Sequence, residues 1–153
     1  MDDRVSRVRA RLNRMNAEDP TGREIPFADR VESWVARLKA APSDALLIAA
    51  RGQHVKRWTV PRDSYPEGRG GYLRWREDLK RIHAATVAEV MAAEGFSEAE
   101  IEPVRVVILK KDLASNPDAQ TIEDALCLAF LETQFDDLRE KTPDDKMIEI
   151  LRK

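Results

Sequence analysis

Apolar residues recur every three or four positions along most of the chain, which places them on one face of a helix. The first stripe consists of Val5, Val8, Leu12 and Met15. Loop-forming residues between Asn16 and Gly22 end it. A second stripe consists of Phe27, Val31, Trp34, Val35 and Leu38. Pro42, Ser43 and Asp44 then stop one helix and cap the next, which we expect to carry Leu46, Leu47, Ala50 and His54.

The same spacing continues through the second half of the chain. A long amphipathic helix ending at Gly95 is expected to carry Tyr72, Trp75, Leu79, Ile82, Thr86 and Val90. Ser97 and Glu100 form a capping box before a helix with a face of Ile101, Val104, Ile108 and Leu109. Thr121 and Asp124 form a similar box, and the segment from Ile122 to Glu132 is apolar almost all round, which predicts a central buried helix. A last helix opens at Thr142 and Pro143 and carries Met147, Ile148 and Leu151.

These elements predict an all-α fold. The chain has no run of alternating β-branched residues and no repeat of solenoid length. We therefore expect a helical bundle of about six to seven helices that forms a single domain over residues 1–153. Residues 1–15 form its basic N-terminal helix, and residues 58–71, rich in Arg, Pro and Gly, form a long structured loop. Long loops in compact domains are often functional.

Composition narrows the class of protein. With 153 residues, 42% hydrophobic and 35% charged, the chain is large enough to bury a core. The longest apolar run, Ala125 to Leu131, is too short to span a bilayer, and the N-terminus lacks an apolar signal core. We expect a cytoplasmic protein without a membrane partner. The single cysteine, Cys127, lies inside the apolar run and is predicted to pack in the core.

Positive charge is concentrated in the middle of the chain. From Arg51 to Arg81 there are nine Lys or Arg and four acidic residues, although the whole chain has a net charge of −2. Such a segment attracts anions, and planar guanidinium groups suit phosphate or carboxylate. The alternative is a solvated, salt-bridged surface. The candidate anion-binding residues are Arg51, Gln53, Arg57, Arg62, Arg69, Arg76 and Lys110.

Three polar residues interrupt otherwise apolar helix faces. His54 and His83 follow apolar residues at steps of four, so we expect both imidazoles to point toward the core and to need a partner there. Asp124 stands in the expected first turn of the most apolar helix, where a carboxylate can cap the helix or bind a ligand. The three could hold a divalent metal. Hydrogen-bonded core histidines and an N-terminal cap explain them equally simply.

Several phrases resemble an uncharacterised domain-of-unknown-function family of bacteria and fungi. They are NAEDP (Asn16 to Pro20), RGQHVKRW (Arg51 to Trp58), VPRDSYPEGRGGYLRWREDL (Val60 to Leu79) and QTIEDALCLAFLE (Gln120 to Glu132). Fungal members are often labelled glutamyl-tRNA synthetase, but the sequence shows no nucleotide-binding fold, so we do not expect that activity. The resemblance adds Asn16, Glu18, Asp19, Trp58 and Glu123 to the residues of interest.

More distantly, the order of the helices resembles the HD-domain metal-dependent phosphohydrolases. That resemblance implies an HD-like bundle with His54, His83 and Asp124 as metal ligands. Val55 occupies the position of the Asp in His-Asp, and a first-helix His is replaced near Phe27. Any metal is then lost or held differently, with help from Glu18, Asp19 or Glu123.

Two functions of different classes are consistent with these features. One is an HD-like enzyme that uses a divalent metal to hydrolyse a phosphate-bearing small molecule such as a nucleotide. The other is a degenerate HD-like domain that binds an anionic ligand, or RNA, without catalysis. RNA is the weaker variant because the sequence pI of about 5.8 gives no overall basic surface. The sequence does not indicate whether the protein is a monomer or an oligomer.

Overall fold

The computed structural model describes residues 2–133, 140 and 142–152. Within these residues the protein contains helices and no strands, which confirms the all-α prediction. The elements are α1 (Asp3–Asn16), α2 (Glu24–Leu38), α3 (Asp44–Arg51), the short 3₁₀ helices η1 (Arg57–Thr59) and η2 (Arg62–Ser64), α4 (Arg69–Ala93), α5 (Glu98–Leu109), α6 (Pro117–Thr133) and α8 (Asp144–Leu151). None of the described helices has the length and apolar character needed to cross a membrane.

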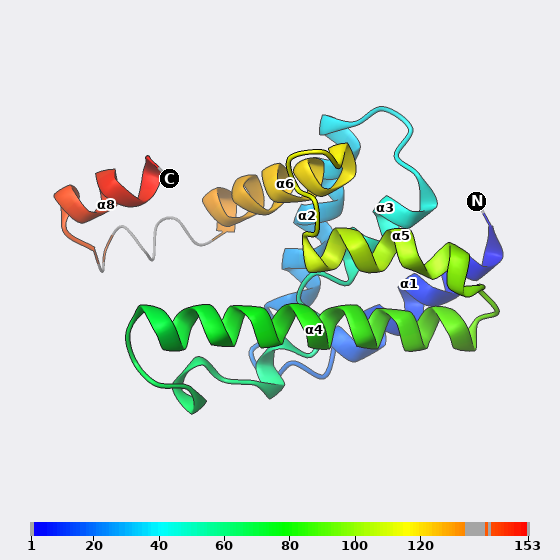
Figure 1. The fold of residues 1–153 in the computed structure, drawn as a ribbon, viewed down its shortest axis with the longest axis horizontal. Helices are drawn as coiled ribbons and strands as arrows, with labels where there is room; N and C mark the ends of the chain where they lie inside the picture. The colour runs from blue at the N-terminus through cyan, green and yellow to red at the C-terminus, as the bar shows by residue number, and fades with distance from the viewer. Residues whose placement is uncertain (1, 134–139, 141, 153) are drawn as a thin grey trace.

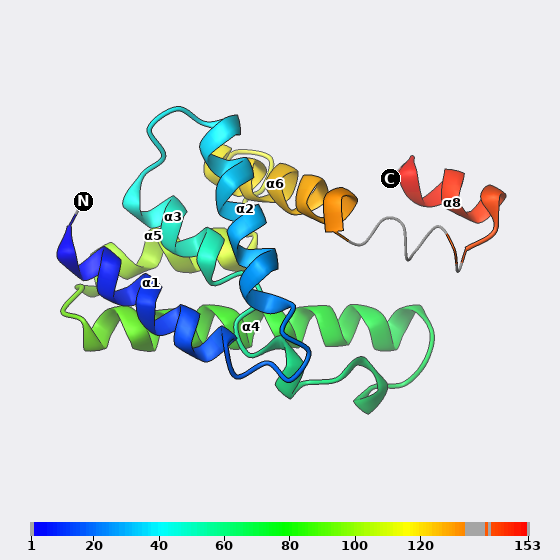
Figure 2. The ribbon, with the colours of Figure 1, turned by 180° about the vertical axis from the view of Figure 1, so that it is seen from behind.

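Helix α4 is the longest of the described helices and lies along the long axis of the molecule (Figure 1). Helices α1 and α5 run beside its C-terminal half, and its N-terminal half extends past them (Figures 1 and 2). Helix α2 packs against α6 and α3, and α3 in turn packs against α5 and α1. The core between these helices includes Val8, Val31, Leu46, Val87 and Ile108, each almost fully buried. Most of the predicted apolar stripes of α1, α2, α4 and α5 therefore face one shared interior, whereas Leu38 and Tyr72 at the ends of their stripes are exposed.

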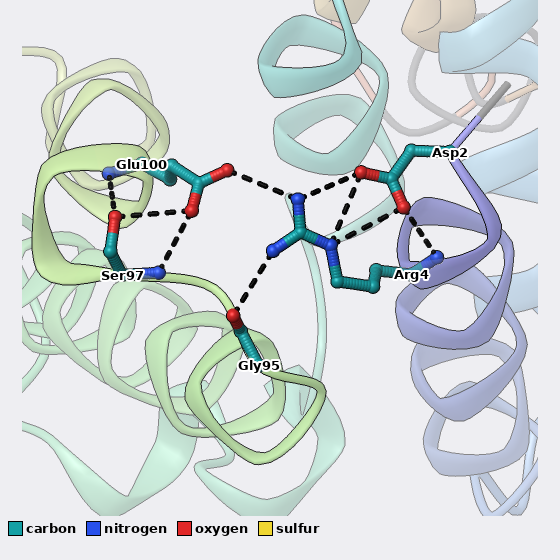
Figure 3. A network of polar contacts seen from close by, with 5 residues as sticks. All are labelled: Asp2, Arg4, Gly95, Ser97 and Glu100. Atoms are coloured by element: carbon teal, nitrogen blue, oxygen red, sulfur yellow. Dashed lines mark hydrogen bonds and ion pairs between the residues drawn. The ribbon is translucent and has the colours of Figure 1, made fainter.

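Polar side chains begin these helices. The Ser43 hydroxyl accepts a hydrogen bond from the Leu46 amide, and Ser97 and Glu100 form a reciprocal capping box, as predicted. The N-terminus of α1 has a more extended arrangement (Figure 3). Asp2 caps the helix by accepting from the Arg4 amide, and the Arg4 guanidinium donates to the Gly95 carbonyl and to Glu100. These contacts attach the start of α1 to the turn between α4 and α5.

The segment between η1 and α4 is fixed to α4 by three side chains. The Trp75 indole donates to the Val60 carbonyl at 2.8 Å, and the Tyr65 hydroxyl donates to Asp78 at 2.6 Å. The Arg62 guanidinium donates to the carbonyls of Tyr65, Pro66 and Gly68. Backbone groups of a loop need such partners, because they have no helix to satisfy them. The segment is thus ordered around Arg62, but it is shorter than the loop predicted over residues 58–71, because α4 already begins at Arg69.

Two predicted helix boundaries are wrong. Helix α3 ends at Arg51, so His54 lies in the turn after it and not on its buried face. A Cβ at Gly52 would stand 2.4 Å from the Val87 side chain, which shows how closely the chain approaches α4 as it leaves the helix. Helix α6 begins at Pro117, where Asn116 accepts from the amides of Asp118 and Ala119, four residues before the box predicted at Thr121.

Helix α6 is also less buried than predicted. It buries one face, made of Ala119, Ile122, Ala125 and Ala129. Leu131 is 43% exposed and Cys127 is exposed, so the prediction of a central helix buried all round, with Cys127 in the core, is wrong. The small alanines let α2 pack closely on this face, and the larger apolar residues lie beside it. In α8, Ile148 is exposed, and the side chains of Met147 and Leu151 lie outside the described residues.

Candidate functional site

A cavity of about 380 Å³ lies where the turn after α3 meets α4, the end of α5 and α6. This volume falls within the usual range for small-molecule sites. The cavity, which we call the histidine cavity, brings together residues that are far apart in the sequence: Phe27, Gln53, His54, Arg57, Tyr72, Arg76, Leu79, Lys80, His83, Ile108, Lys110, Glu123, Leu126, Cys127 and Phe130.

His83 is a buried wall of the histidine cavity. Its side chain projects from α4, and its Nδ1 lies 2.7 Å from the Val55 carbonyl oxygen. Since a carbonyl only accepts, Nδ1 carries the hydrogen and Nε2 is left as a bare acceptor. Burial lowers the pKa of His83 to about 3, and the neighbouring His54 contributes to this shift. His83 is therefore neutral at physiological pH, with a fixed tautomer.

His54 lies beside His83, with their ring centroids 6.3 Å apart. Its ring stacks on Phe27 at a centroid distance of 4.3 Å and an interplanar angle of 3°. Nδ1 lies 3.3 Å from Glu24 Oε2, at the first turn of α2. Burial lowers the pKa of His54, and the nearby Glu24 carboxylate opposes this without outweighing it. Two neutral imidazoles thus share one cavity. The sequence predicted that both would point inward, but it placed His54 on a helix and not in the turn that follows α3.

Four cations line the histidine cavity. Arg76 donates to the Tyr72 hydroxyl, Lys80 pairs with Glu77, and Lys110 pairs with Glu123. Glu123 is the one acidic side chain among the described lining residues. The cavity is therefore electropositive although the whole chain is weakly acidic.

Arg57 differs from the other three cations. Among the residues that the structure describes, its guanidinium has neither a hydrogen bond nor an ion pair, and its one aromatic contact is the face of the Trp75 ring at 5.3 Å. The side chain is half-buried, and this burial lowers the pKa of Arg57 below its usual value. The nearby Glu24 carboxylate opposes this shift without forming an ion pair. A half-buried guanidinium without a hydrogen-bonded carboxylate can accept an anion.

The backbone adopts a left-handed conformation at two lysines beside this cavity. Lys56, which precedes Arg57, has φ of 62°, and Lys110, which follows α5, has φ of 58°. For residues other than glycine this conformation costs free energy on the order of 1 kcal/mol. Ala41 and Asp112, which line neither cavity, also have positive φ, so this conformation is not confined to the site. The two turns fix where Arg57 and Lys110 enter the cavity wall.

A second cavity, of about 570 Å³, adjoins the first and shares Phe27, His54 and Arg57 with it. We call this second cavity the tryptophan cavity, because two tryptophans and two prolines stand among its lining residues. The remaining lining residues are Asp19, Thr21, Gly22, Arg23, Glu24, Pro26, Trp58, Val60, Pro61, Arg62, Trp75 and Thr133. Glu24 Oε2 is buried here without a hydrogen-bond partner among the described residues.

The NAEDP segment is structural around Asp19. The buried Asp19 carboxylate accepts from Thr21, from the Arg23 amide and from the Glu24 amide, so it caps α2. Burial alone would raise the pKa of Asp19, but these hydrogen bonds outweigh it and hold the pKa below the usual value. Asn16 is buried at the end of α1, whereas Glu18 is exposed and lines neither cavity. The segment positions Glu24 against His54.

The predicted anion-binding residues separate into three groups. Gln53, Arg57, Arg76 and Lys110 line the histidine cavity, and Arg62, together with Arg57, lines the tryptophan cavity. Trp58, which the family resemblance added, also lines the tryptophan cavity. Arg51 is 4% exposed and pairs with Asp29 at 2.8 Å and with Glu32 at 2.5 Å, so it joins α3 to α2. Arg69 is exposed at the start of α4 and lines neither cavity.

The predicted metal ligands are brought together only in part. Asp124 is exposed and accepts from Gln120, whereas its neighbour Glu123 faces the histidine cavity. Within the described part of the chain, no three His, Cys, Asp or Glu side chains are grouped so that they could hold a metal ion. Arg57 and Lys110 also act against a cation here, since both lower the pKa of His54 by their positive charge. The arrangement does not fit the three-ligand metal of an HD domain.

Sequence reasoning missed Glu24, Tyr72 and Lys80 as site residues. Tyr72 and Lys80 lie eight residues apart on α4 and so share one face of it with Arg76. That four-residue spacing was the signal that could have found them. Glu24 has no comparable signal, because its position depends on how the Asp19 cap aims the start of α2.

Comparison with known proteins identifies the family. No curated protein matches this chain, and no solved structure matches it. A family model described as a domain of unknown function does match, and it covers residues 6–153, a range that includes every residue lining the two cavities. The chain therefore belongs to the family named Domain of unknown function (DUF4202).

Proposed function

We propose that the histidine cavity binds a small molecule that carries a phosphate group, and that Arg57 is the principal contact of that group. The observation that supports this most is the half-buried Arg57 guanidinium, which has neither a hydrogen bond nor an ion pair among the described residues, although the Glu24 carboxylate is near enough to act on it electrostatically. Arg76 and Lys110 line the same cavity and would add charge-assisted hydrogen bonds. A concave site favours a small molecule over RNA, which binds to extended basic surfaces.

His83 supplies a complementary contact. Its Nδ1 hydrogen is held by the Val55 carbonyl, so Nε2 can only accept a hydrogen bond. A phosphate monoester that still carries one proton, or a hydroxyl group next to the phosphate, would donate to it. The cavity therefore combines cationic donors with one fixed neutral acceptor.

Thermal unfolding of the purified protein tests this proposal. Inorganic phosphate is compared with chloride at equal ionic strength, in buffer that contains a chelator. A ligand at about 100 times its Kd stabilises the folded state by about 2.7 kcal/mol, so phosphate is expected to raise Tm and chloride is not. Equal Tm values in the two salts at every concentration would contradict the proposal.

Metal-dependent hydrolysis of the bound phosphate ester is the second candidate, and the resemblance to HD domains motivates it. The observation in its favour is that His54 and His83 line one cavity, with ring centroids 6.3 Å apart. The chelator separates the two candidates. Under anion binding alone, the phosphate effect persists in chelator and purified protein carries no stoichiometric metal. Loss of the effect on chelation, together with a stoichiometric transition metal, would favour the hydrolase.

A further inference from the structure

The two cavities meet at a common wall made of Phe27, His54 and Arg57. Arg57 faces both of them, so a phosphate held by its guanidinium stands at the edge of the tryptophan cavity. The two cavities therefore lie on either side of the same three side chains, and one ligand that contacts Arg57 can reach residues of both. The identity of the rest of the ligand can be inferred from the tryptophan cavity, and this inference rests on the proposed phosphate site.

The tryptophan cavity has the lining of a site for a flat ring. Trp58 is half-buried and contributes its indole to the wall, together with Trp75 and the rings of Pro26 and Pro61. The Trp75 ring is already engaged, because Arg57 lies over it and the indole nitrogen donates to Val60. Trp58 is thus the aromatic surface that remains for stacking, which large aromatic side chains do in offset or edge-on geometry.

The Glu24 carboxylate in this cavity has one oxygen without a hydrogen bond of good geometry to any described residue. Glu24 Oε2 is buried without a hydrogen bond among the described residues, although His54 Nδ1 stands 3.3 Å away. Buried carboxylate oxygens are rarely left unsatisfied, because they have given up the water that would bind them. An N–H group on a ligand would satisfy Glu24 Oε2.

We propose that the ligand of this protein is an aromatic phosphate whose ring bears an N–H or amino group. The phosphate lies against Arg57 in the histidine cavity, the ring stacks on Trp58 in the tryptophan cavity, and the amino group donates to Glu24 Oε2. The ligand is then recognised at both of its ends, by Arg57 and by Glu24.

Isothermal titration calorimetry with three simple probes tests this assignment. The probes are methyl phosphate, phenyl phosphate and 4-aminophenyl phosphate, all titrated in the presence of chelator. We expect phenyl phosphate to bind about tenfold more tightly than methyl phosphate, because stacking is gained. We expect the amino group to add at least a further factor of about three.

Two variants assign the gains to residues. Trp58→Leu should remove most of the advantage of phenyl over methyl phosphate. Glu24→Met should remove the advantage of the amino group and leave the phenyl-to-methyl ratio unchanged. Because the result is a ratio of affinities within each variant, a uniform change in phosphate affinity does not affect it.

The possible failures are distinguishable in the wild-type protein. If methyl phosphate binds and the two aryl phosphates bind no more tightly, the aromatic ligand is wrong and the phosphate site stands. If none of the three probes binds, the phosphate site is wrong and the aromatic ligand is wrong with it. Equal affinity for phenyl and 4-aminophenyl phosphate contradicts the role of Glu24.

Discussion

At the scale of single residues, the site consists of polar side chains that are held in place by one neighbour and can still bind a ligand. His83 has its Nδ1 hydrogen held by Val55, and His54 is held between Phe27 and Glu24. Arg57 has an aromatic contact but neither a hydrogen bond nor an ion pair among the described residues. Groups held in this way bind a ligand without first losing side-chain entropy.

The buried His83 also makes folding depend on pH. Its pKa is about 3 in the folded protein and about 6.5 when exposed, so below pH 6.5 the unfolded chain binds a proton that the folded protein excludes. The stabilising contribution is complete above pH 6.5 and is lost at roughly 1.4 kcal/mol per pH unit as the pH falls toward 3.

The variant His83→Gln tests this, because an amide can still donate to Val55 but does not titrate in this range. Between about pH 7.5 and about pH 5, wild-type protein should lose about 2 kcal/mol more unfolding free energy than the variant. Urea unfolding at the two pH values measures both. Identical losses in the two proteins would show that His83 is protonated without cost and is not buried as described.

At the scale of elements, the segment from Trp58 to Gly71 determines the shape of the tryptophan cavity. Arg62 gathers three carbonyls of this segment, and Trp75 and Tyr65 attach it to α4. The chain then enters α4 at Gly71, where a Cβ would stand 1.8 Å from the Pro66 carbonyl oxygen. The junction needs a residue without a side chain.

Substituting this glycine should break the junction. Gly71→Ala forces the Pro66 carbonyl away and is expected to cost about 1–3 kcal/mol of unfolding free energy, as overpacking does elsewhere. Gly70→Ala is the matched control, because a Cβ there meets nothing within 4 Å. It should be neutral or stabilise the helix by up to about 1 kcal/mol. Chemical denaturation measures the unfolding free energy of both variants. Equal stability of Gly71→Ala and Gly70→Ala would contradict the close approach of Gly71 to the Pro66 carbonyl.

Helix positions followed well from the sequence, and two boundaries did not. The caps at Ser43 and Ser97 are local signals, and the structure has both. The end of α3 depends instead on Gly52 meeting Val87, a contact between distant segments that periodicity does not contain. The start of α6 offered two competing caps, and Asn116 followed by Pro117 begins the helix before Thr121 is reached.

The candidate site was predictable to the extent that it depends on residue type. His54, His83, Arg57 and Lys110 were singled out, and they line one cavity. The rotation of α6 about its axis was not predictable, because its apolar residues surround the helix and its buried face consists largely of alanines. One residue along a helix turns the side chain by about 100°, which is why Glu123 faces the cavity and Asp124 faces away.

At the scale of the whole molecule, positive and negative charges are unevenly distributed. The net charge is only −2, yet the histidine cavity gathers Arg57, Arg76, Lys80 and Lys110 around a single carboxylate among its described residues. Other cations are neutralised in structural contacts: Arg51 joins α3 to α2, and Arg4 joins α1 to the α4–α5 turn (Figure 3). Positive charge is therefore concentrated at the histidine cavity.

The most direct test of the phosphate site is calorimetric titration of inorganic phosphate into wild-type protein and two arginine variants, with chelator present. Arg57→Gln removes the unpaired guanidinium and should weaken binding by about tenfold or more. Arg69→Gln removes an exposed guanidinium that lines neither cavity, and should change affinity by less than about twofold. Equal affinity in Arg57→Gln and Arg69→Gln, or no binding to the wild-type protein, would contradict a phosphate site centred on Arg57.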